Sequence, residues 1–217
     1  MIITFDIETL PTTDQSVIDE LAAGIKPPAT HKKQETIDAW MAENKEAALK
    51  EAVSKTSFDG MYGRIACIGW SDCDVVFASS AEDTEREAIE LFYAFIQNEC
   101  RTVDIFCGHN IAGFDLPFLK HRSIILGIKP PKVLLQAMNA KPWDSCIADT
   151  MLMWSSDPHK RGSMDRLCKA FGIAGKGDFD GSMVAETWPV DPAKVIEYCK
   201  DDVRRTREIY KRITFGE

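Results

Sequence analysis

The chain has 217 residues, 45% of them hydrophobic and 28% charged, which excludes a disordered protein and suits a single domain over residues 1–217. The formal net charge of −8 argues against a surface that is basic throughout, so binding to a polyanion would have to depend on local positive charge. Seven cysteines without metal-ligand spacing, and no apolar stretch long enough to span a bilayer, predict a cytoplasmic protein with reduced thiols and no membrane partner.

In chain order, the opening segment MIITFDIETL predicts a strand whose apolar run is long enough to be buried on both faces. A polar and largely helical insertion follows at about residues 11–60, and its middle, 34–55, predicts one exposed amphipathic helix. Segments 64–72 and 73–80 predict two adjacent strands.

The middle of the chain predicts alternating elements. Apolar residues at helical spacing indicate a helix over residues 80–100, and segment 102–110 indicates another strand. In segment 114–127, Pro117 suits the first turn of a helix and Gly127 suits its end.

The last third begins with a loop rich in lysine and proline and a short apolar stretch up to Asp149, which we expect to cap a helix starting at Thr150. A helix over 163–171, a glycine-rich loop and a final helix follow, the last with Asp191 as its N-cap and Pro192 at its first position. This order of elements predicts an α/β fold with a central mixed sheet of about five strands flanked by helices.

Several carboxylates occupy positions where an ordinary fold would bury apolar side chains. Asp6 and Glu8 are two residues apart in the first strand, so both side chains emerge on the same face. Asp202 follows Tyr198 by about one helical turn and interrupts the core-facing stripe of the last helix. That stripe consists of Val195, Cys199, Asp202, Thr206 and Ile209. Because an unpaired buried carboxylate would take up a proton or destabilise the fold, a cation or proton is expected at each of these positions.

Three segments together resemble a known family. FDIETL, GHNIAGFDLPFL and the Tyr-Cys-Lys-Asp-Asp segment occur in the order of the three exonuclease motifs of the DnaQ-like, ribonuclease H-like superfamily. The third segment is similar to the DEDDy branch, whose last motif is Tyr-x-x-x-Asp, and the resemblance over residues 3–202 is strongest to the proofreading domain of family B DNA polymerases. It implies a ribonuclease H-like fold and a metal-dependent 3′–5′ exonuclease.

The resemblance also implies roles for individual residues. The implied ligands of two divalent ions, Mg²⁺ or Mn²⁺, are the carboxylates Asp6, Glu8, Asp115 and Asp202. Tyr198 matches the catalytic tyrosine. The residues that match contacts to the 3′-terminal nucleotide are Thr9, Leu10, Asn110 and Phe114. The insertion at about 11–60 departs from the compact core of the family, so the resemblance implies no role for it.

The chemistry of phosphodiester hydrolysis explains these residue types. Two ions held about 4 Å apart lower the pKa of a bound water and stabilise the departing 3′ oxygen, and the product is a nucleoside monophosphate. Hard cations prefer the oxygen ligands that carboxylates supply. Tyr198, with an ordinary pKa of about 10, is neutral near pH 7 and is expected to orient the attacking water or the phosphate. The other branch has a histidine five residues before the last aspartate, where this chain has Glu197.

Each of these residues also has a structural interpretation. Asp6 and Glu8 could cap the end of a strand, Asp115 could be the N-cap of its helix, and Asp202 could lie on a solvated face of the last helix. Leu10 and Phe114 are core residues by type, and Asn110 can form a turn. The joint order and spacing of the motifs favour the nuclease interpretation.

The expected substrate is a single-stranded DNA 3′ end, bound in a strongly salt-dependent way with a base stacked on an aromatic ring such as Phe114. Candidate phosphate contacts are the basic residues of segments 120–122 and 159–161 and of the last helix. RNA is the alternative substrate, because contacts to the 2′ position cannot be located in the sequence. A replication or repair protein could be a partner.

Three other functions compete with this one. A phosphatase with an aspartyl nucleophile would carry Asp-x-Asp where this chain has Asp-x-Glu. A non-catalytic nucleic-acid-binding module on the same fold would be expected to have lost at least one carboxylate, and all four are present. An exoribonuclease of the same superfamily shares all the motifs, and only the likeness to proofreading domains favours DNA.

Overall fold

The computed structural model describes residues 1–73, 75–82, 84–99, 103, 105–155, 162–175 and 177–216. Within these residues, five strands form one sheet in the order β3-β2-β1-β4-β5. The strands are β1 (Ile2–Leu10), β2 (Arg64–Ser71), β3 (Phe77–Ser80), β4 (Ile105–Gly108) and β5 (Ile147–Asp149). The central strand β1 pairs antiparallel with β2 and parallel with β4, so the expected mixed sheet of about five strands is confirmed.

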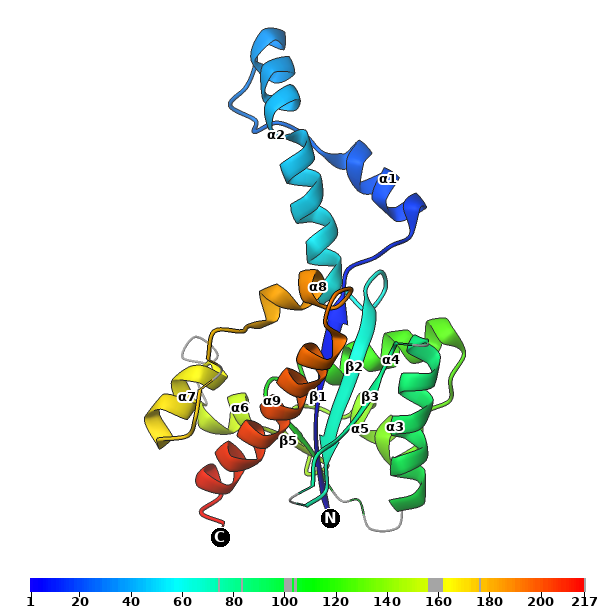
Figure 1. Cartoon of the computed structure of the whole chain (residues 1–217), viewed down its shortest axis with the longest axis vertical. Helices are drawn as coiled ribbons and strands as arrows, with labels where there is room; N and C mark the ends of the chain where they lie inside the picture. Colours follow the sequence, from blue (N-terminus) through cyan, green and yellow to red (C-terminus); the bar gives the residue numbers. More distant parts are fainter. Residues whose placement is uncertain are drawn as a thin grey trace.

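Helices cover both faces of this sheet (Figure 1). On one face, α3 (Glu85–Glu99), α4 (Asp115–Leu126) and α5 (Lys132–Asn139) enclose the main hydrophobic core. The long helix α9 (Pro192–Ile213) crosses the other face, against β1 and β2. Short elements complete this second side: α6 (Thr150–Trp154), α7 (Met164–Phe171), η2 (Gly181–Met183) and α8 (Val184–Thr187). The sheet is therefore enclosed on both sides, as its apolar strands require.

The alternation of side chains along β1 separates apolar residues from polar ones. Phe5 and Ile7 are buried in the main core beside α3 and α4. Asp6 lies on the opposite face, where the Sγ atom of Cys199 on α9 contacts it. The carboxylates of β1 therefore face the helix that carries Asp202.

Gly69 allows α9 to approach the sheet closely. This residue lies opposite Asp6 in the β1–β2 ladder. A Cβ atom at Gly69 would lie 3.1 Å from Sγ of Cys199 and 3.2 Å from the side chain of Val203, which is tighter than an ordinary van der Waals contact. The missing side chain therefore lets α9 bring its polar residues against β1.

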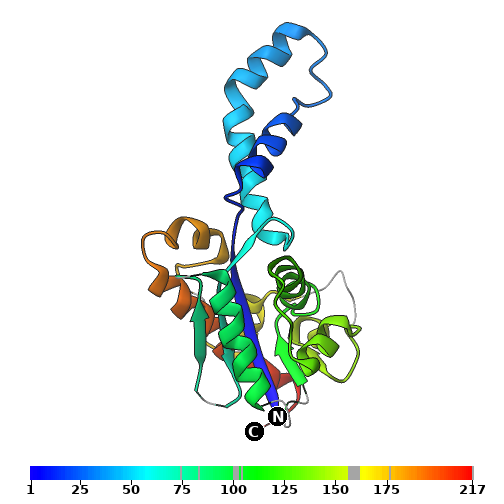
Figure 2. The ribbon, with the colours of Figure 1, turned by 90° about the vertical axis from the view of Figure 1, so that its right-hand side faces the viewer.

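Residues 11–60 form a helical hairpin that projects from the sheet, as Figures 1 and 2 show. It consists of α1 (Gln15–Gly24), α2 (Gln34–Lys55) and the 3-10 turn η1 (Thr56–Phe58). The helix expected at residues 34–55 has these bounds, whereas α1 was not expected. Neither α1 nor α2 contains a buried residue, so these two helices add nothing to the main core.

Some expected element boundaries were wrong. The strand expected over 73–80 begins only at Phe77, and the helix expected over 80–100 begins at Glu85. The later start of α3 follows from Thr84, whose hydroxyl accepts a hydrogen bond from the backbone N–H of Glu87 at 3.1 Å and thus caps the helix.

Helix α5 lies in a segment that was expected to be a loop. Its residues Leu134, Ala137 and Met138 are buried, and their spacing is that of an amphipathic helix. The lysines and prolines just before this segment obscured the pattern.

Several expected helix ends are confirmed. Gly127 ends α4 with a left-handed φ of 65°, and the carboxylate of Asp191 caps α9 by accepting from the N–H of Lys194. The basic segment 159–161 lies outside the described residues. Across the part of the chain that the structure describes, no helix is both long and apolar enough to cross a membrane.

Candidate active site

Asp6 and Glu8 lie within β1 and face α9. One donor atom from each of Asp6, Glu8 and Cys199 can be chosen so that all three lie within 4.8 Å of one another. Glu8 is buried and Asp6 is half-buried, so neither carboxylate belongs to an exposed turn. A β-bulge between Glu8 and Thr9 interrupts the register with β2 just beyond the pair, a common feature beside active sites.

The Cys199 thiol borders this pair of carboxylates. Its Sγ atom is 3.4 Å from the backbone oxygen of Asp6 and 3.8 Å from Oδ2 of the same residue. A hydrogen bond with the Cys67 thiol, burial, and the charges of Asp6 and Glu8 raise the pKa of Cys199 well above its ordinary value. The thiol is therefore neutral near pH 7, and the oxygen atoms are the charged donors. The sequence showed only that Cys199 belongs to the core-facing stripe.

Asp115 reaches β1 from a distant segment. It is the first residue of α4, follows the N-cap residue Phe114, and is almost completely buried. Its Oδ1 atom accepts a hydrogen bond of 3.1 Å from the backbone N–H of Ile7. Since β4 pairs with β1 only over Ile2–Thr4, that N–H lies beyond the β1–β4 ladder. The bond places Asp115 against the backbone that joins Asp6 to Glu8.

The electrostatic environment of Asp115 is unfavourable to its charged form. Burial raises the pKa of this carboxyl group to about 7, and the negative charges of Asp149 and Asp202 contribute to the rise, whereas backbone N–H groups oppose it. A divalent cation beside Asp115 would reverse this effect by favouring the carboxylate. The buried oxygen donors and their mutual repulsion therefore fit a hard divalent cation.

Asp202 is buried on α9 and does not lie on a solvated face. Its Oδ1 atom accepts a hydrogen bond of 2.7 Å from Nη1 of Arg205, one turn further along the helix. Arg205 also donates to the backbone oxygens of Ala174 and Gly175, so it links Asp202 to the glycine-rich loop. The negative charge of Asp202 also contributes, as the smallest of the causes, to the raised pKa of Asp115.

Tyr198 precedes Asp202 by one turn and is buried beside the end of β1. Its ring packs edge to face with Phe179, with 4.9 Å between the ring centroids. Leu10 and Cys199 belong to the same small hydrophobic cluster. The packing fixes the direction of the tyrosine ring relative to the carboxylates.

Asp149 holds the loop that precedes Asp115. As expected, its carboxylate caps α6, accepting from the N–H groups of Met151 and Leu152. The same carboxylate also accepts hydrogen bonds from the N–H groups of Asn110 at 3.0 Å and Ala112 at 3.1 Å. This second contact could not be predicted from the sequence, because it joins residues 39 positions apart.

The four residues expected to contact substrate differ in exposure. Leu10 is buried, whereas Thr9, Asn110 and Phe114 are partly exposed. Asn110 forms a turn with a left-handed φ of 67°, and its backbone oxygen accepts a hydrogen bond from the backbone N–H of Phe114. The Thr9 hydroxyl donates to the backbone oxygen of Ser57 at 2.7 Å. Their contacts with a nucleotide stay predictions.

The basic residues expected to meet phosphates are largely engaged within the protein. Arg122 is buried, and its Nε and Nη2 atoms each bond one carboxylate oxygen of Glu85 at 2.8 Å. Lys120 donates to the side-chain oxygen of Asn139. On α9, Arg204 pairs with Glu197 at 2.7 Å, and Arg205 pairs with Asp202. The pair of Arg205 with Asp202 follows from helical spacing, whereas the sequence could not show that Glu85 lies beside Arg122.

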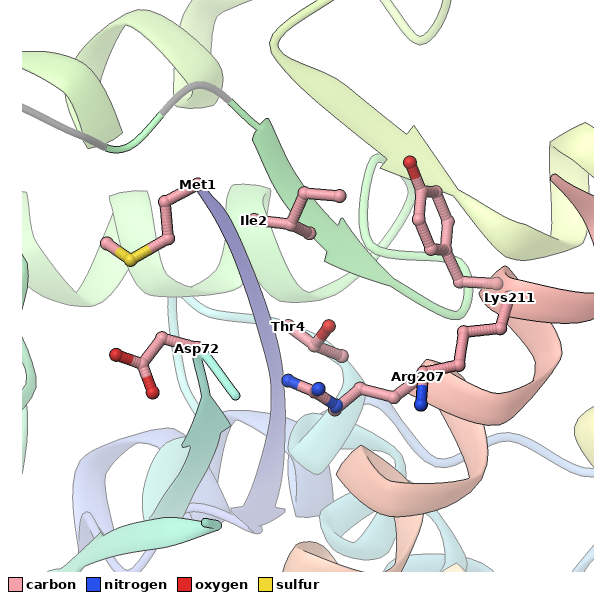
Figure 3. Close-up of a pocket in the computed structure, with 7 residues that line it drawn as sticks. Met1, Ile2, Thr4, Asp72, Arg207 and Lys211 are labelled. Atoms are coloured by element: carbon pink, nitrogen blue, oxygen red, sulfur yellow. The ribbon is translucent and has the colours of Figure 1, made fainter. Parts of the chain in front are cut away.

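A cavity of about 280 Å³ lies apart from the carboxylates, and Figure 3 shows it. It is lined by Met1, Ile2, Thr4, Asp72, Arg207, Tyr210 and Lys211. The Arg207 guanidinium donates to Oγ of Ser71 at 3.1 Å. Because these residues surround the amino-terminal end of β1, the cavity is separate from the candidate active site.

The chain belongs to a family described as predicted 3′–5′ exonucleases related to the exonuclease domain of PolB, and residues 64–216 match the family. The matched region contains Asp115, Tyr198 and Asp202, whereas Asp6 and Glu8 precede it. No curated protein matches the chain.

Among solved structures, the chain is similar to the family B DNA polymerase from the hyperthermophilic archaeon Pyrobaculum calidifontis, with a TM-score of 0.61 and 20% sequence identity. The similarity covers 98% of this chain and 24% of the polymerase, so the chain spans about a quarter of that protein's length. At this identity the similarity establishes the fold alone, which is ribonuclease H-like.

Proposed function

We propose that this protein is a metal-dependent 3′–5′ exonuclease that hydrolyses single-stranded DNA from its 3′ end by a two-metal-ion mechanism and releases nucleoside monophosphates. The supporting observation is the gathering of carboxylates from three distant segments around the middle of β1, in a member of a family of predicted 3′–5′ exonucleases. We further propose that residues 1–217 form one domain, with the hairpin as an insertion.

The proposed ligands of the two ions, Mg²⁺ or Mn²⁺, are Asp6, Glu8, Asp115 and Asp202. The unfavourable burial of Asp115, with its pKa of about 7, supports this assignment because a cation would offset the negative charge. When bound, a pair of such ions favours deprotonation of the attacking water and balances the charge that develops on the departing 3′ oxygen.

The residues of the chain have distinct tasks in this proposal. The Ile7 N–H positions Asp115, and Arg205 positions Asp202. The Tyr198 hydroxyl orients the attacking water or the scissile phosphate, since the ring is held by packing. The terminal nucleotide is held by Thr9, Leu10, Asn110 and Phe114.

The substrate is proposed to be DNA, because the polymerase with the similar fold is a DNA polymerase. The net charge of −8 and the paired basic residues support modest, salt-sensitive affinity. The six cysteines of the described residues are free thiols, which favours a cytoplasmic location. A replication or repair protein is the proposed class of partner.

The decisive experiment uses 5′-labelled single-stranded DNA and an RNA of the same sequence, each with Mg²⁺ or Mn²⁺ and with a chelator as control. We expect a ladder of shortened DNA products that depends on the metal. Cleavage of RNA alone would reassign the protein as an exoribonuclease, and no ladder with either substrate would reject the enzyme.

A further inference from the structure

Phe58 is an exposed aromatic residue beside the candidate active site. Its surface is 72% exposed, although it lies at the base of the hairpin, next to the body of the protein. Its ring centroid is 6.4 Å from that of Phe114, the residue that immediately precedes Asp115. Single exposed aromatic residues are common, so exposure alone does not indicate a function for Phe58. The contacts that fix its position beside the site carry the argument.

The turn η1 that carries Phe58 is anchored to the end of β1. The Thr9 hydroxyl donates to the oxygen of Ser57 at 2.7 Å. The backbone N–H of Thr12 donates to the hydroxyl of Thr56 at 2.8 Å, and Thr56 is itself buried. The turn is therefore fixed to the strand that bears Asp6 and Glu8, only a few residues beyond them.

The segment after the turn is anchored to α4. Nη1 of Arg122 donates to the backbone oxygen of Gly60 at 3.3 Å. A Cβ atom at Gly60 would lie 2.9 Å from Cβ of His121 and 3.0 Å from the backbone oxygen of Phe118, so this backbone lies directly on the helix. Phe58 is thus held from both sides while its ring stays open to solvent.

We propose that Phe58 is a stacking site for a nucleobase of a single-stranded substrate, adjacent to the base held at Phe114. The location rests on the proposed function, because two residues assigned there to the terminal nucleotide, Thr9 and Phe114, both contact η1. The two rings are neighbours and lie at 58° to each other. Every base has a face that can stack on such a ring, so the site tolerates any sequence.

This site also favours single strands over duplexes. A base in a duplex is already stacked and has to be unpaired before it can reach Phe58, whereas a free strand has no such cost. Phe58 lies outside the region that matches the exonuclease family, so the hairpin would contribute a substrate contact that the family match does not contain.

The test measures base stacking separately from hydrolysis. The probe is a single-stranded DNA with 2-aminopurine next to the 3′-terminal nucleotide, titrated with protein in the presence of Ca²⁺. The variants are Phe58→Ala and Phe58→Trp, with Trp143→Ala as a control, because Trp143 is 81% exposed and precedes the amino-terminal end of β5. Thermal unfolding checks that each variant is folded.

We expect the wild type to quench the fluorescence and Phe58→Ala to lose the quenching, with Kd and KM for the oligonucleotide raised about tenfold. The turnover number kcat should change little, Phe58→Trp should retain binding, and Trp143→Ala should match the wild type. A double-stranded substrate with a paired 3′ end should be much less sensitive to Phe58→Ala.

The outcomes separate the two proposals. If Phe58→Ala keeps the Kd and the quenching of the wild type, the stacking site is wrong, whether or not DNA is degraded. The exposed ring would then be assigned to contact with a protein partner. Quenching that depends on Phe58 without any nucleotide release would support the stacking site and reject the exonuclease. No binding by the wild type would overturn both.

Discussion

The carboxylate region, which comprises Asp6, Glu8, Asp115 and Asp202, is held by contacts between distant segments, whereas the helical hairpin has few contacts with the body of the protein. Around the carboxylates, the Ile7 N–H bonds Asp115 across 108 residues of sequence, and Cys199 contacts Asp6 across 193 residues. In the hairpin, α1 and α2 bury no residue. An ion pair from α2 to the body joins the exposed side chains of Lys50 and Glu186, and such surface pairs contribute little stability.

The two regions should therefore respond differently to substitution. In the carboxylate region, the side chains come from β1, α4 and α9, so we expect a change to one residue to affect the others. The hairpin can change in its outer part without disturbing any buried contact. Only its base, where η1 meets β1, joins the two regions.

Removal of a carboxylate should have the strongest effect, a loss of activity. Asp6→Ala should lower the rate of DNA degradation by about a hundredfold to a thousandfold or more, since it removes charge that the reaction requires. Rates are measured on 5′-labelled single-stranded DNA with Mg²⁺. Asp19→Ala, a change on the exposed surface of α1, is the matched control and should keep the wild-type rate. Equal rates for all three proteins would contradict the assignment of Asp6.

A smaller effect is expected at Tyr198. Tyr198→Phe keeps the ring that packs on Phe179 but removes the hydroxyl, so turnover should fall by roughly tenfold to a hundredfold while folding is unchanged. Single-turnover rates at saturating DNA test this. An unchanged rate would show that the hydroxyl has no orienting role.

The stability of the metal-free protein should depend on the protonation of Asp115. Its pKa in the folded protein, about 7, is higher than the ordinary value of 3.8, so the protonated group stabilises the fold below about pH 4. That contribution is lost as the pH rises through about 7. Asp115→Asn removes it, so the difference in Tm between the wild type and this variant should change across the interval.

Metal should reverse this trend in the wild type. Adding Mg²⁺ or Mn²⁺ near pH 8 should raise the Tm of the wild type more than that of Asp115→Asn, because bound cations stabilise the native carboxylates. A difference in Tm that stays constant from pH 4 to pH 8, with or without metal, would contradict the proposed role of Asp115.

The smallest effect is expected from shortening the hairpin. Replacing residues 15–52 by a three-residue glycine-serine linker keeps Thr12 and Thr56, whose hydrogen bond already brings the two ends together. We expect the Tm to change by no more than about 4 °C, which corresponds to about 1 kcal/mol, and the activity on short oligonucleotides to persist. A large loss of Tm would show that the hairpin belongs to the folding unit.

Much of the architecture could be predicted from local patterns. The apolar run of β1, the caps of α9 at Asp191 and of α6 at Asp149, and the left-handed Gly127 are properties of neighbouring residues, so the sequence reveals them. The missed helix α5 has a regular apolar spacing that was hidden by the lysines and prolines before it. Helix α1 was not expected, although α2, which likewise has no buried residue, was.

The types and spacing of the candidate site residues could be read from the amino-acid sequence: an alternating pair at Asp6 and Glu8, and one helical turn between Tyr198 and Asp202. The packing of distant segments was needed to establish that Arg122 pairs with Glu85, that Asp149 also holds the Asn110 loop, and that Phe58 lies beside Phe114. Spacing along a strand or helix is set by local backbone geometry, whereas ion pairs between segments, burial and the pKa of Asp115 depend on which distant segments pack together.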